Sequence, residues 1–343
     1  MKNHMNPLPA FVSNFFDGKT VVVTGGAGFI GSHLCDALLT VNANVIAVDN
    51  LITGHVENII HLRNSPDKKF RFIQGDVSQE PERYLKIHLT PDVVLHFASP
   101  ASPPRYQEFP VETYSANCFG THNLLRYLMA HNPKATFLYA STSEVYGDPQ
   151  IHPQLESYWG NVNPNGIRSC YDEAKRMGET ICGIHARNFN FNARIVRIFN
   201  TYGPRMDLRD GRVIPNFIDA VLHRQPLVIF GDGKQTRAYC YVSDLVEGIL
   251  RYAATPNLGG ETINLGNPGE FTIQQTAEVV KEVISQVAPQ LGHIKTTSAP
   301  LPKDDPLRRQ PDITKAKKLL GWQPQISFLD GLTETFKYYL AKQ

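Results

Sequence analysis

A glycine-rich turn near the start of the chain limits the folds that the sequence can adopt. The turn joins the apolar run KTVVVTGG (19–26) to the segment FIGSHLCDALLTV (29–41), whose apolar residues recur at helical spacing. A second apolar run, NVIAVDN (44–50), follows the helical segment. Continuous apolar runs of this length are typical of parallel strands buried on both faces. The three segments together predict a β-α-β unit that opens the fold.

The same alternation continues to about residue 200. Helical stretches at 112–131 and 168–188 separate further strand-like runs. Those runs are FRFIQGD (70–76), DVVLHFAS (92–99), ATFLYAS (135–141) and NARIVRIFN (192–200). Strands that alternate with helices in this way predict an α/β fold with a Rossmann-type, doubly wound parallel sheet.

The spacing of the glycines indicates what the first turn binds. Gly25, Gly28 and Gly31 let the backbone approach a pyrophosphate, whose charge the N-terminus of the following helix meets. Asp49 ends the second strand, where a carboxylate can accept hydrogen bonds from ribose hydroxyls and would repel a 2′-phosphate. The pattern therefore predicts NAD rather than NADP as the cofactor. Asp76 ends the third strand and is a candidate either for the adenine edge or for a strand-end cap.

The composition of the chain changes after about residue 200, where loops rich in Gly, Pro and charged residues separate shorter elements. Long loops inside a compact protein are usually functional. The 343 residues suffice for one large or two medium domains. We predict a leader at 1–17, an NAD-binding Rossmann domain at 18–200, and a smaller α/β lobe that takes up most of 201–343.

Charge and cysteine content argue against several classes of protein. Lys and Arg number 34 against 32 Asp and Glu, and no run of like charges suggests a nucleic-acid or membrane surface. The first residues contain neither a signal-peptide block nor a membrane span. The five cysteines are odd in number and never form C-x-x-C, which argues against a disulfide framework and a zinc site. We expect a small-molecule substrate, no metal and a cytoplasmic location.

Catalytic chemistry is indicated by Tyr171 and Lys175, four residues apart and therefore on one face of the predicted helix. A free phenol titrates near roughly 10, and a neighbouring ammonium together with the positive nicotinamide favours the phenolate. Thr142, after the strand at 135–141, could orient a substrate alcohol opposite the phenol. Such a Tyr-x-x-x-Lys pair also occurs with a structural role, so the pair alone leaves both interpretations open.

Three motifs together resemble the extended short-chain dehydrogenases/reductases that act on nucleotide sugars: TGGAGFIG (24–31), STSEVYG (141–147) and YDEAK (171–175). The resemblance covers about residues 18–341. Within that superfamily, six longer blocks are very similar to UDP-glucuronic acid decarboxylases, also called UDP-xylose synthases. The blocks are HFASPASPPRY (96–106), YWGNVNPNGIRSCYDEAKR (158–176), RIFNTYGPRM (197–206), DGRVIPNF (210–217), QTRAYCYVSDL (235–245) and NLGNPGEFTI (264–273).

The resemblance implies a set of site residues and a nucleotide-sugar-binding role for the second lobe. The cofactor contacts would be Gly25, Gly28, Phe29, Ile30, Gly31, Asp49, Asn50, Thr53, Asp76, Val77, Ser99, Tyr171 and Lys175. The substrate contacts would be Tyr106, Asn200, Arg212, Arg237 and Arg309, and the catalytic residues Thr142, Glu144, Tyr171, Lys175 and Arg237. The family also implies a homodimer through the helices at 112–131 and 168–188. The pair Ser115-Ala116 stands where relatives commonly have Lys-Thr before Asn117, so the family's detailed contacts at these positions are not carried over to this chain.

The implied reaction is the NAD-dependent decarboxylation of UDP-glucuronate to UDP-xylose through a 4-keto intermediate, with tightly bound NAD recycled. Dehydratases that act on the 4,6 positions of UDP- or dTDP-glucose show Thr-Asp-Glu where this chain has Thr142, Ser143 and Glu144. Ser143 is a poor proton donor for the leaving hydroxyl, and 4-epimerases usually lack a carboxylate at Glu144. The dehydratase and the epimerase stay as alternatives. A non-catalytic nucleotide-sugar or NAD sensor is a third, against which the presence of Tyr171, Lys175 and Thr142 argues.

The arginines allow more than one role. Arg237 could bind the C6 carboxylate of a uronic acid through two parallel hydrogen bonds, or it could contact the diphosphate or form a surface ion pair. Arg212 and Arg309, in loops of the second lobe, would suit the diphosphate, or either could be a solvated charge. Glu144 could position a water or proton for C5, or it could repel the substrate carboxylate and favour its loss. The sequence does not reveal whether UDP-xylose or a 4-keto pentose is released.

Two further features have structural explanations. His96 ends an apolar strand and is expected to be a satisfied core histidine rather than a catalyst. The pair Asp304–Asp305 has no His or Cys beside it, so a solvated loop is expected there instead of a metal site.

Overall fold

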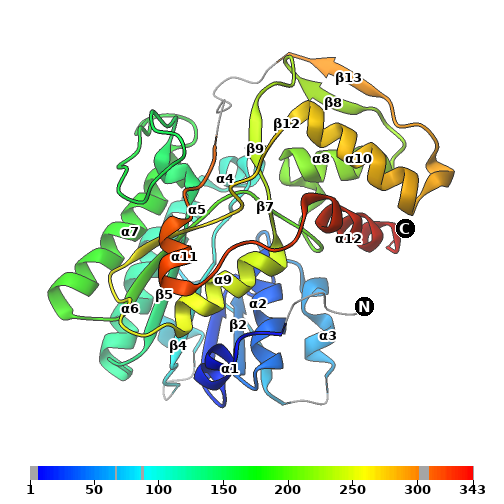
Figure 1. Cartoon of the computed structure of the whole chain (residues 1–343). Helices are drawn as coiled ribbons and strands as arrows, with labels where there is room; N and C mark the ends of the chain where they lie inside the picture. The colour runs from blue at the N-terminus through cyan, green and yellow to red at the C-terminus, as the bar shows by residue number, and fades with distance from the viewer. Residues whose placement is uncertain (1–6, 66–67, 86–88, 301–308, 343) are drawn as a thin grey trace.

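A parallel sheet of seven strands forms the body of the computed structural model, which describes residues 7–65, 68–85, 89–300 and 309–342 (Figure 1). Its order is β11-β6-β5-β4-β1-β2-β3. The strands are β1 (Thr20–Thr24), β2 (Asn44–Asp49), β3 (Phe70–Gln74), β4 (Val93–His96), β5 (Thr136–Thr142), β6 (Ala193–Ile198) and β11 (Thr262–Leu265). All six neighbouring pairs run parallel. The predicted Rossmann-type sheet is therefore confirmed.

Helices cover both faces of this sheet because successive residues of each buried strand point to opposite sides. In β1, Val21 and Val23 pack with α2 (Phe29–Thr40), whereas Val22 packs with the layer on the other face. That other layer contains α5 (Pro110–Ser115), a π-helical turn (Ala116–Gly120), α6 (Thr121–His131) and α7 (Ser169–Phe189). The helix predicted at 112–131 is thus divided by a π-helical turn.

The second lobe lies over the carboxyl ends of the strands (Figure 1). It is built from two small sheets and three helices. The strands are β8 (Leu227–Phe230) paired with β13 (Thr296–Ala299), and β9 (Thr236–Ala238) paired antiparallel with β12 (Glu270–Thr272). The helices are α8 (Val213–Leu222), α10 (Ile273–Val287) and α12 (Phe328–Leu340). The predicted smaller α/β lobe is present.

The path of the chain differs from the predicted division in two places. Helix α9 (Val242–Ala254) and strand β11 lie beyond residue 200, yet α9 packs against α2 and β11 pairs with β6 in the main sheet. Residues 10–16, part of the predicted leader, form α1 (Ala10–Phe16), whose Val12 and Phe16 are buried against the same core. The first lobe therefore includes α1, which precedes the predicted domain, and α9 and β11, which follow it.

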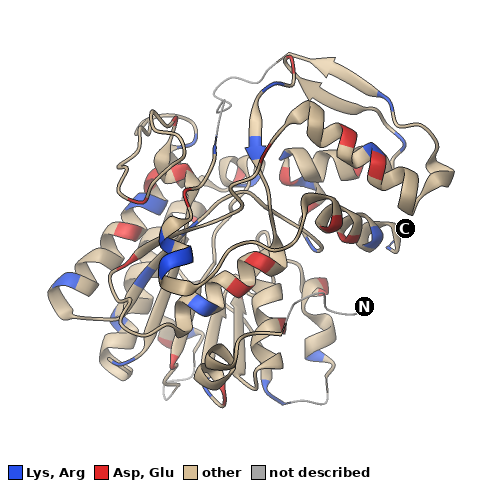
Figure 2. Ribbon diagram, in the orientation of Figure 1, with Lys and Arg blue, Asp and Glu red and all other residues tan. Residues whose placement is uncertain are grey.

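Short elements complete the described chain. The helices are α3 (Ile60–Arg63), α4 (Pro103–Glu108) and α11 (Thr314–Leu320), and β7 (Thr201–Tyr202) pairs with β10 (Cys240–Tyr241). Single 3₁₀ turns occur at Val56–Asn58, Pro81–Arg83, Ser143–Tyr146, Leu208–Asp210 and Pro289–Leu291. Basic and acidic residues are distributed over both lobes (Figure 2). Within the described ranges, none of the helices combines the length and the apolar composition that crossing a membrane would need.

Candidate active site

Every site residue predicted from the sequence lines one cavity of about 600 Å³. It lies between the carboxyl ends of the sheet and the second lobe, where a doubly wound fold binds its ligands. The first lobe contributes Gly25, Gly28, Phe29, Ile30, Gly31, Asp49, Asn50, Thr53, Asp76, Val77, Ser99, Tyr106, Thr142, Glu144, Tyr171 and Lys175. Asn200, Arg212, Arg237 and Arg309 come from the chain beyond residue 199. The fold thus brings the residues together, while their individual roles stay predictions.

The glycine turn between β1 and α2 fits a dinucleotide. Gly25 has φ +70°, a conformation that L side chains rarely adopt, and a Cβ at Gly31 would lie 2.0 Å from the Gly25 carbonyl oxygen. Gly28 precedes α2 without a side-chain cap on the first backbone N–H groups. The helix therefore presents its N-terminus to the cavity, as a pyrophosphate requires.

Asp49 lies at the end of β2, where the sequence placed the ribose contact. Its Oδ2 accepts a hydrogen bond from the Ala27 N–H at 3.0 Å, and its Oδ1 accepts one from Leu51 at 2.8 Å. Burial raises the pKa of this carboxyl. Asp76 both lines the cavity and accepts the Ser78 N–H at 2.9 Å, so the structure accommodates both interpretations of that residue.

Tyr171 and Lys175 occupy one buried face of α7, opposite the end of β5. The Lys175 Nζ donates to the Ala140 carbonyl at 2.7 Å and lies 5.6 Å from the centre of the Tyr171 ring. Burial raises the pKa of Tyr171, and the nearby Thr142 hydroxyl only partly offsets this effect. Burial also lowers the pKa of Lys175 to about 7. The positive charge of a bound nicotinamide would therefore be needed to favour the phenolate at neutral pH.

Glu144 is held between two arginines. Arg309 pairs with its Oε1 and Arg168 with its Oε2. Burial raises the pKa of Glu144, but Arg309 and Arg168 outweigh that effect and leave the pKa below its ordinary value. Arg309 also donates to the Gly147 carbonyl at 3.0 Å. Arg309 was expected to suit a diphosphate, whereas in the protein alone it contacts the carboxylate at the centre of the site.

Sequence reasoning missed Arg168, which immediately precedes α7. Its Nε lies 3.6 Å from Asp172 Oδ2, so the guanidinium joins Glu144 to a second carboxylate. Burial, and then the negative charge of Glu144, raise the pKa of Asp172 to about 7. A signal existed, because Arg168 stands one helical turn before Tyr171 and therefore close to the same face.

The two remaining predicted arginines have partners of their own. Arg212 pairs with Asp210, with Nη2 and Oδ2 2.6 Å apart. Arg237 lies on β9, lines the cavity and donates to the Thr236 carbonyl at 2.8 Å. The contact of Arg237 with a substrate carboxylate stays a prediction.

His96 is a satisfied core histidine, as expected. It is 1% exposed, and its Nδ1 lies 2.7 Å from the Thr24 hydroxyl and its Nε2 3.2 Å from the Ala116 carbonyl. Across the described part of the chain, no group of three or more His, Cys, Asp or Glu residues is placed to hold a metal ion. Asp304 and Asp305 lie outside the described residues.

Comparison with known proteins was made by family and by structure. The model of the NAD dependent epimerase/dehydratase family matches residues 21–266. UDP-glucuronic acid decarboxylase 4 of Arabidopsis thaliana is 52% identical over 312 residues, which are 91% of this chain and 66% of that protein. UDP-glucuronic acid decarboxylase 6 of the same plant is 47% identical over 328 residues, 95% of this chain and 90% of that protein. The chain thus spans slightly less than two thirds of the first relative and nearly all of the second.

Solved structures agree in fold. The epimerase Mth375 of Methanothermobacter thermautotrophicus superposes with a TM-score of 0.85 at 28% identity, covering 98% of this chain and 97% of that one. A mutant of the UDP-glucuronic acid 4-epimerase of Bacillus cereus, solved with UDP-4-deoxy-4-fluoro-glucuronic acid and NAD, gives 0.81 at 29% identity. That match covers 94% of this chain and 100% of the other.

Proposed function

The chain belongs to the NAD dependent epimerase/dehydratase family, and from this premise we infer that it is an NAD-dependent UDP-glucuronic acid decarboxylase. It converts UDP-glucuronate to UDP-xylose through a 4-keto sugar. The observation that carries the inference is the position of Glu144, which lies between Arg309 and Arg168 beside the Tyr171–Lys175 pair. A uronic acid brings a carboxylate to be bound and then lost, and this cluster offers both cations and a competing carboxylate.

The residues present fit NAD. The turn at Gly25–Gly31 would take the pyrophosphate, Asp49 the adenosine ribose and Lys175 the nicotinamide ribose. When bound, NAD supplies the reversible oxidation of the sugar at C4.

Tyr171 acts on the sugar 4-hydroxyl. Its phenol oxygen takes the hydroxyl proton during oxidation and returns it at the end of the cycle. Thr142, which lines the same cavity as that phenol, orients the same hydroxyl. The ammonium of Lys175 stabilises the phenolate, because an adjacent positive charge favours the charged form.

Carbon dioxide is lost at the 4-keto stage. The bond between C5 and C6 breaks, its electron pair moves toward the C4 carbonyl, and the resulting enolate takes a proton at C5. Glu144 stands where it can repel the C6 carboxylate or position the water that supplies this proton, while Arg168 and Arg309 hold the charged groups in place. Ser143, 2% exposed, provides no acid for eliminating water from a neutral sugar.

The direct test is an incubation of the purified protein with NAD⁺ and UDP-glucuronate, following CO₂ release and UDP-pentose. We expect stoichiometric CO₂ and UDP-xylose, with the 4-keto pentose as a minor product. No CO₂ under these conditions would refute the proposal. Product from UDP-glucose or dTDP-glucose instead would identify a dehydratase or an epimerase.

We also propose a homodimer built from α5, the π-helical turn and α7. Support comes from large apolar side chains that are exposed on these neighbouring elements. They are Val111, Tyr114, Phe119, Met177 and Ile184. Sedimentation equilibrium should give twice the chain mass of 38.4 kDa, and Phe119→Glu should give the monomer.

A cytoplasmic location is proposed on the chemistry of the thiols. All five cysteines are unpaired, and none of them is fully exposed. Reduced thiols in odd number suit a reducing compartment. A fluorescent fusion expressed in the native host would test the proposal by its distribution.

A further inference from the structure

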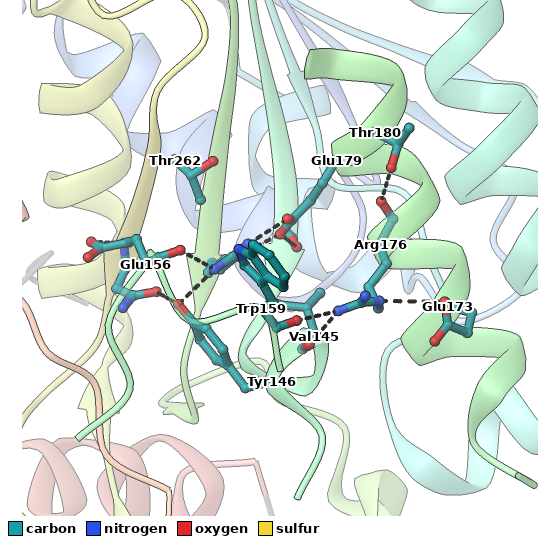
Figure 3. Close-up of polar contacts among 12 residues, drawn as sticks. Val145, Tyr146, Glu156, Trp159, Glu173, Arg176, Glu179, Thr180 and Thr262 are labelled. Atoms are coloured by element: carbon teal, nitrogen blue, oxygen red, sulfur yellow. Dashed lines mark hydrogen bonds and ion pairs between the residues drawn. The ribbon is translucent and has the colours of Figure 1, made fainter. Parts of the chain in front are cut away.

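A partly buried ion pair behind the active site joins α7 to β6. Glu179 lies on α7 and Arg197 on β6. The Arg197 Nε donates to Glu179 Oε1 at 2.9 Å and its Nη2 donates to Oε2 at 2.8 Å, so the contact is bidentate. The two side chains are only 14% and 12% exposed. In Figure 3, Glu179 lies at one end of a set of polar contacts that reaches Tyr146 and Glu156 through the guanidinium of Arg197.

Glu179 also contacts the strand that carries Thr142. The Ser141 hydroxyl donates to Glu179 Oε1 at 2.6 Å, and Ser141 directly precedes Thr142 on β5. Glu179 follows Lys175 by one helical turn and Tyr171 by two, so all three lie on one face of α7. This first arm of the network therefore fixes α7 against β5 where the phenol and the ammonium meet the Thr142 hydroxyl.

The same guanidinium has a second arm. The Arg197 Nη1 donates to the Tyr146 hydroxyl at 2.9 Å and to the Glu156 carbonyl at 3.0 Å. The Tyr146 hydroxyl donates to Asn264 Oδ1 at 2.7 Å, so the phenol is anchored on both sides (Figure 3). Tyr146 is two residues after Glu144. This arm therefore fixes the segment that carries Glu144.

Residues 147–168 connect Tyr146 to α7, and hydrogen bonds from a further arginine hold this segment against the helix. The Arg176 Nη1 donates to the Trp159 carbonyl at 2.7 Å and to the Val145 carbonyl at 3.2 Å (Figure 3). Arg168, which binds Glu144, thus ends a segment tethered to the body of the first lobe. The second arm acts on the groups of the decarboxylation step, whereas the first acts on the groups of C4 oxidation.

Stability alone is a weak reason to place such a pair here. Desolvation of the two partly buried charges offsets much of their attraction, and apolar replacements of similar volume are often at least as stable when such a pair lies in a protein interior. A bidentate pair does fix geometry, since its two parallel hydrogen bonds permit one orientation. What the pair supplies is therefore register between α7, β5 and β6.

We propose that Glu179 and Arg197 are positioning residues with two separable arms, one aligning Tyr171 and Lys175 with Thr142 and the other holding Glu144. The division between oxidation and decarboxylation rests on the proposed function. The physical separation of the arms does not, since it follows from the contacts of the protein alone.

Three variants test the proposal in the full-length protein. Glu179→Gln weakens the first arm, and Ser141→Ala removes one of its bonds with less risk to folding. Tyr146→Phe removes the two hydrogen bonds of the Tyr146 hydroxyl from the second arm. It leaves the bond of Arg197 to the Glu156 carbonyl and the Glu179 contact intact. Arg194→Met is the matched control, because Arg194 is a buried arginine on the same strand whose Nη1 instead donates to the Thr255 carbonyl after α9.

The first measurement is hydrogen exchange by mass spectrometry without ligands. We expect Glu179→Gln and Ser141→Ala to raise exchange in α7 and β5, and Tyr146→Phe to raise it in 147–168 with α7 unchanged. Uniform increases in all variants, as in Arg194→Met, would overturn the proposal. This readout does not depend on which sugar the protein uses.

The second measurement separates the chemical steps in a single turnover with NAD⁺ and UDP-glucuronate. Glu179→Gln and Ser141→Ala should slow the appearance of NADH absorbance, Glu179→Gln by about 10- to 100-fold, the scale of an ångström-sized misplacement. Tyr146→Phe should leave that rate within about threefold and slow CO₂ release instead. Parallel losses of both rates in every variant would show a purely structural role. If wild-type protein releases no CO₂, the proposed function fails, while the exchange patterns still decide this inference.

Discussion

The rings of Tyr106 and Tyr171 are stacked, with centroids 5.0 Å apart and planes inclined by 9°. Tyr106 is 1% exposed, and its hydroxyl has no hydrogen-bond partner among the residues that the structure describes. A buried hydroxyl without a partner loses its hydration for no return within the protein. The stack therefore places a donor without a partner beside Tyr171, the proposed proton-transfer group.

Tyr106→Phe keeps the stack and removes the hydroxyl. We expect the KM for UDP-glucuronate to rise about 3- to 10-fold, the scale of one hydrogen bond, with kcat nearly unchanged. Tyr106→Leu should lower kcat as well, because the ring that packs on Tyr171 is lost. Steady-state kinetics of the two variants check this, and an unchanged KM for Tyr106→Phe would show that the hydroxyl does not meet the substrate.

Tyr171→Phe removes the hydroxyl that we propose as the proton-transfer group. Turnover of UDP-glucuronate should fall by at least ~100-fold, the lower end for loss of a general acid–base group. Binding of NAD, followed by fluorescence titration, should survive because the ring stays in place. Near-normal turnover would contradict the role of Tyr171.

Gly31→Ala tests the dinucleotide turn. Its new Cβ would lie 2.0 Å from the Gly25 carbonyl oxygen, a backbone atom that can move only by distorting the turn. We expect loss of NAD binding in a titration and a lower Tm. Gly18→Ala is the control for substituting a glycine in the same lobe, since nothing lies within 4 Å of its Cβ, although its φ of +68° adds some strain. Normal NAD affinity for Gly31→Ala would exclude this turn as the binding site.

Asp172→Asn should change how stability depends on pH. The pKa of Asp172 is raised to about 7 from its ordinary 3.8, so between these values the folded protein holds a proton that the unfolded chain releases. This carboxyl therefore stabilises the fold fully below pH ~4, and its contribution is lost as the pH rises through about 7. The free energy of unfolding of wild type minus that of Asp172→Asn should fall over this window in urea titrations. A difference that stays constant or rises would contradict the assignment.

Arg237→Ala should weaken UDP-glucuronate far more than UDP-xylose, which lacks the C6 carboxylate. The expected ratio is about 10- to 100-fold, the scale of a hydrogen bond to a charged group. Isothermal titration with both nucleotides checks this, with the exposed Arg209→Ala as the matched control. Equal weakening would indicate that Arg237 contacts the diphosphate.

Local patterns explain why much of the fold and site could be predicted. Buried parallel strands give continuous apolar runs, and the glycine turn and the Tyr171–Lys175 pair are each contained within a few residues. The contact between Arg309 and Glu144 spans 165 positions, so no local pattern could reveal it. Strand β11 has only four residues and resembles the other short elements of its region. Its place beside β6 follows from tertiary packing alone.

That place of β11 has a consequence for synthesis of the protein on the ribosome. Until residues 262–265 emerge, β6 is left as an open edge of the sheet, with unpaired backbone groups that can pair with another chain. The predicted NAD-binding domain at 18–200 ends with β6, so on the ribosome its sheet stays one strand short after residue 200 has been made. Fragments that stop near residue 200, where the composition changes, should therefore aggregate rather than fold.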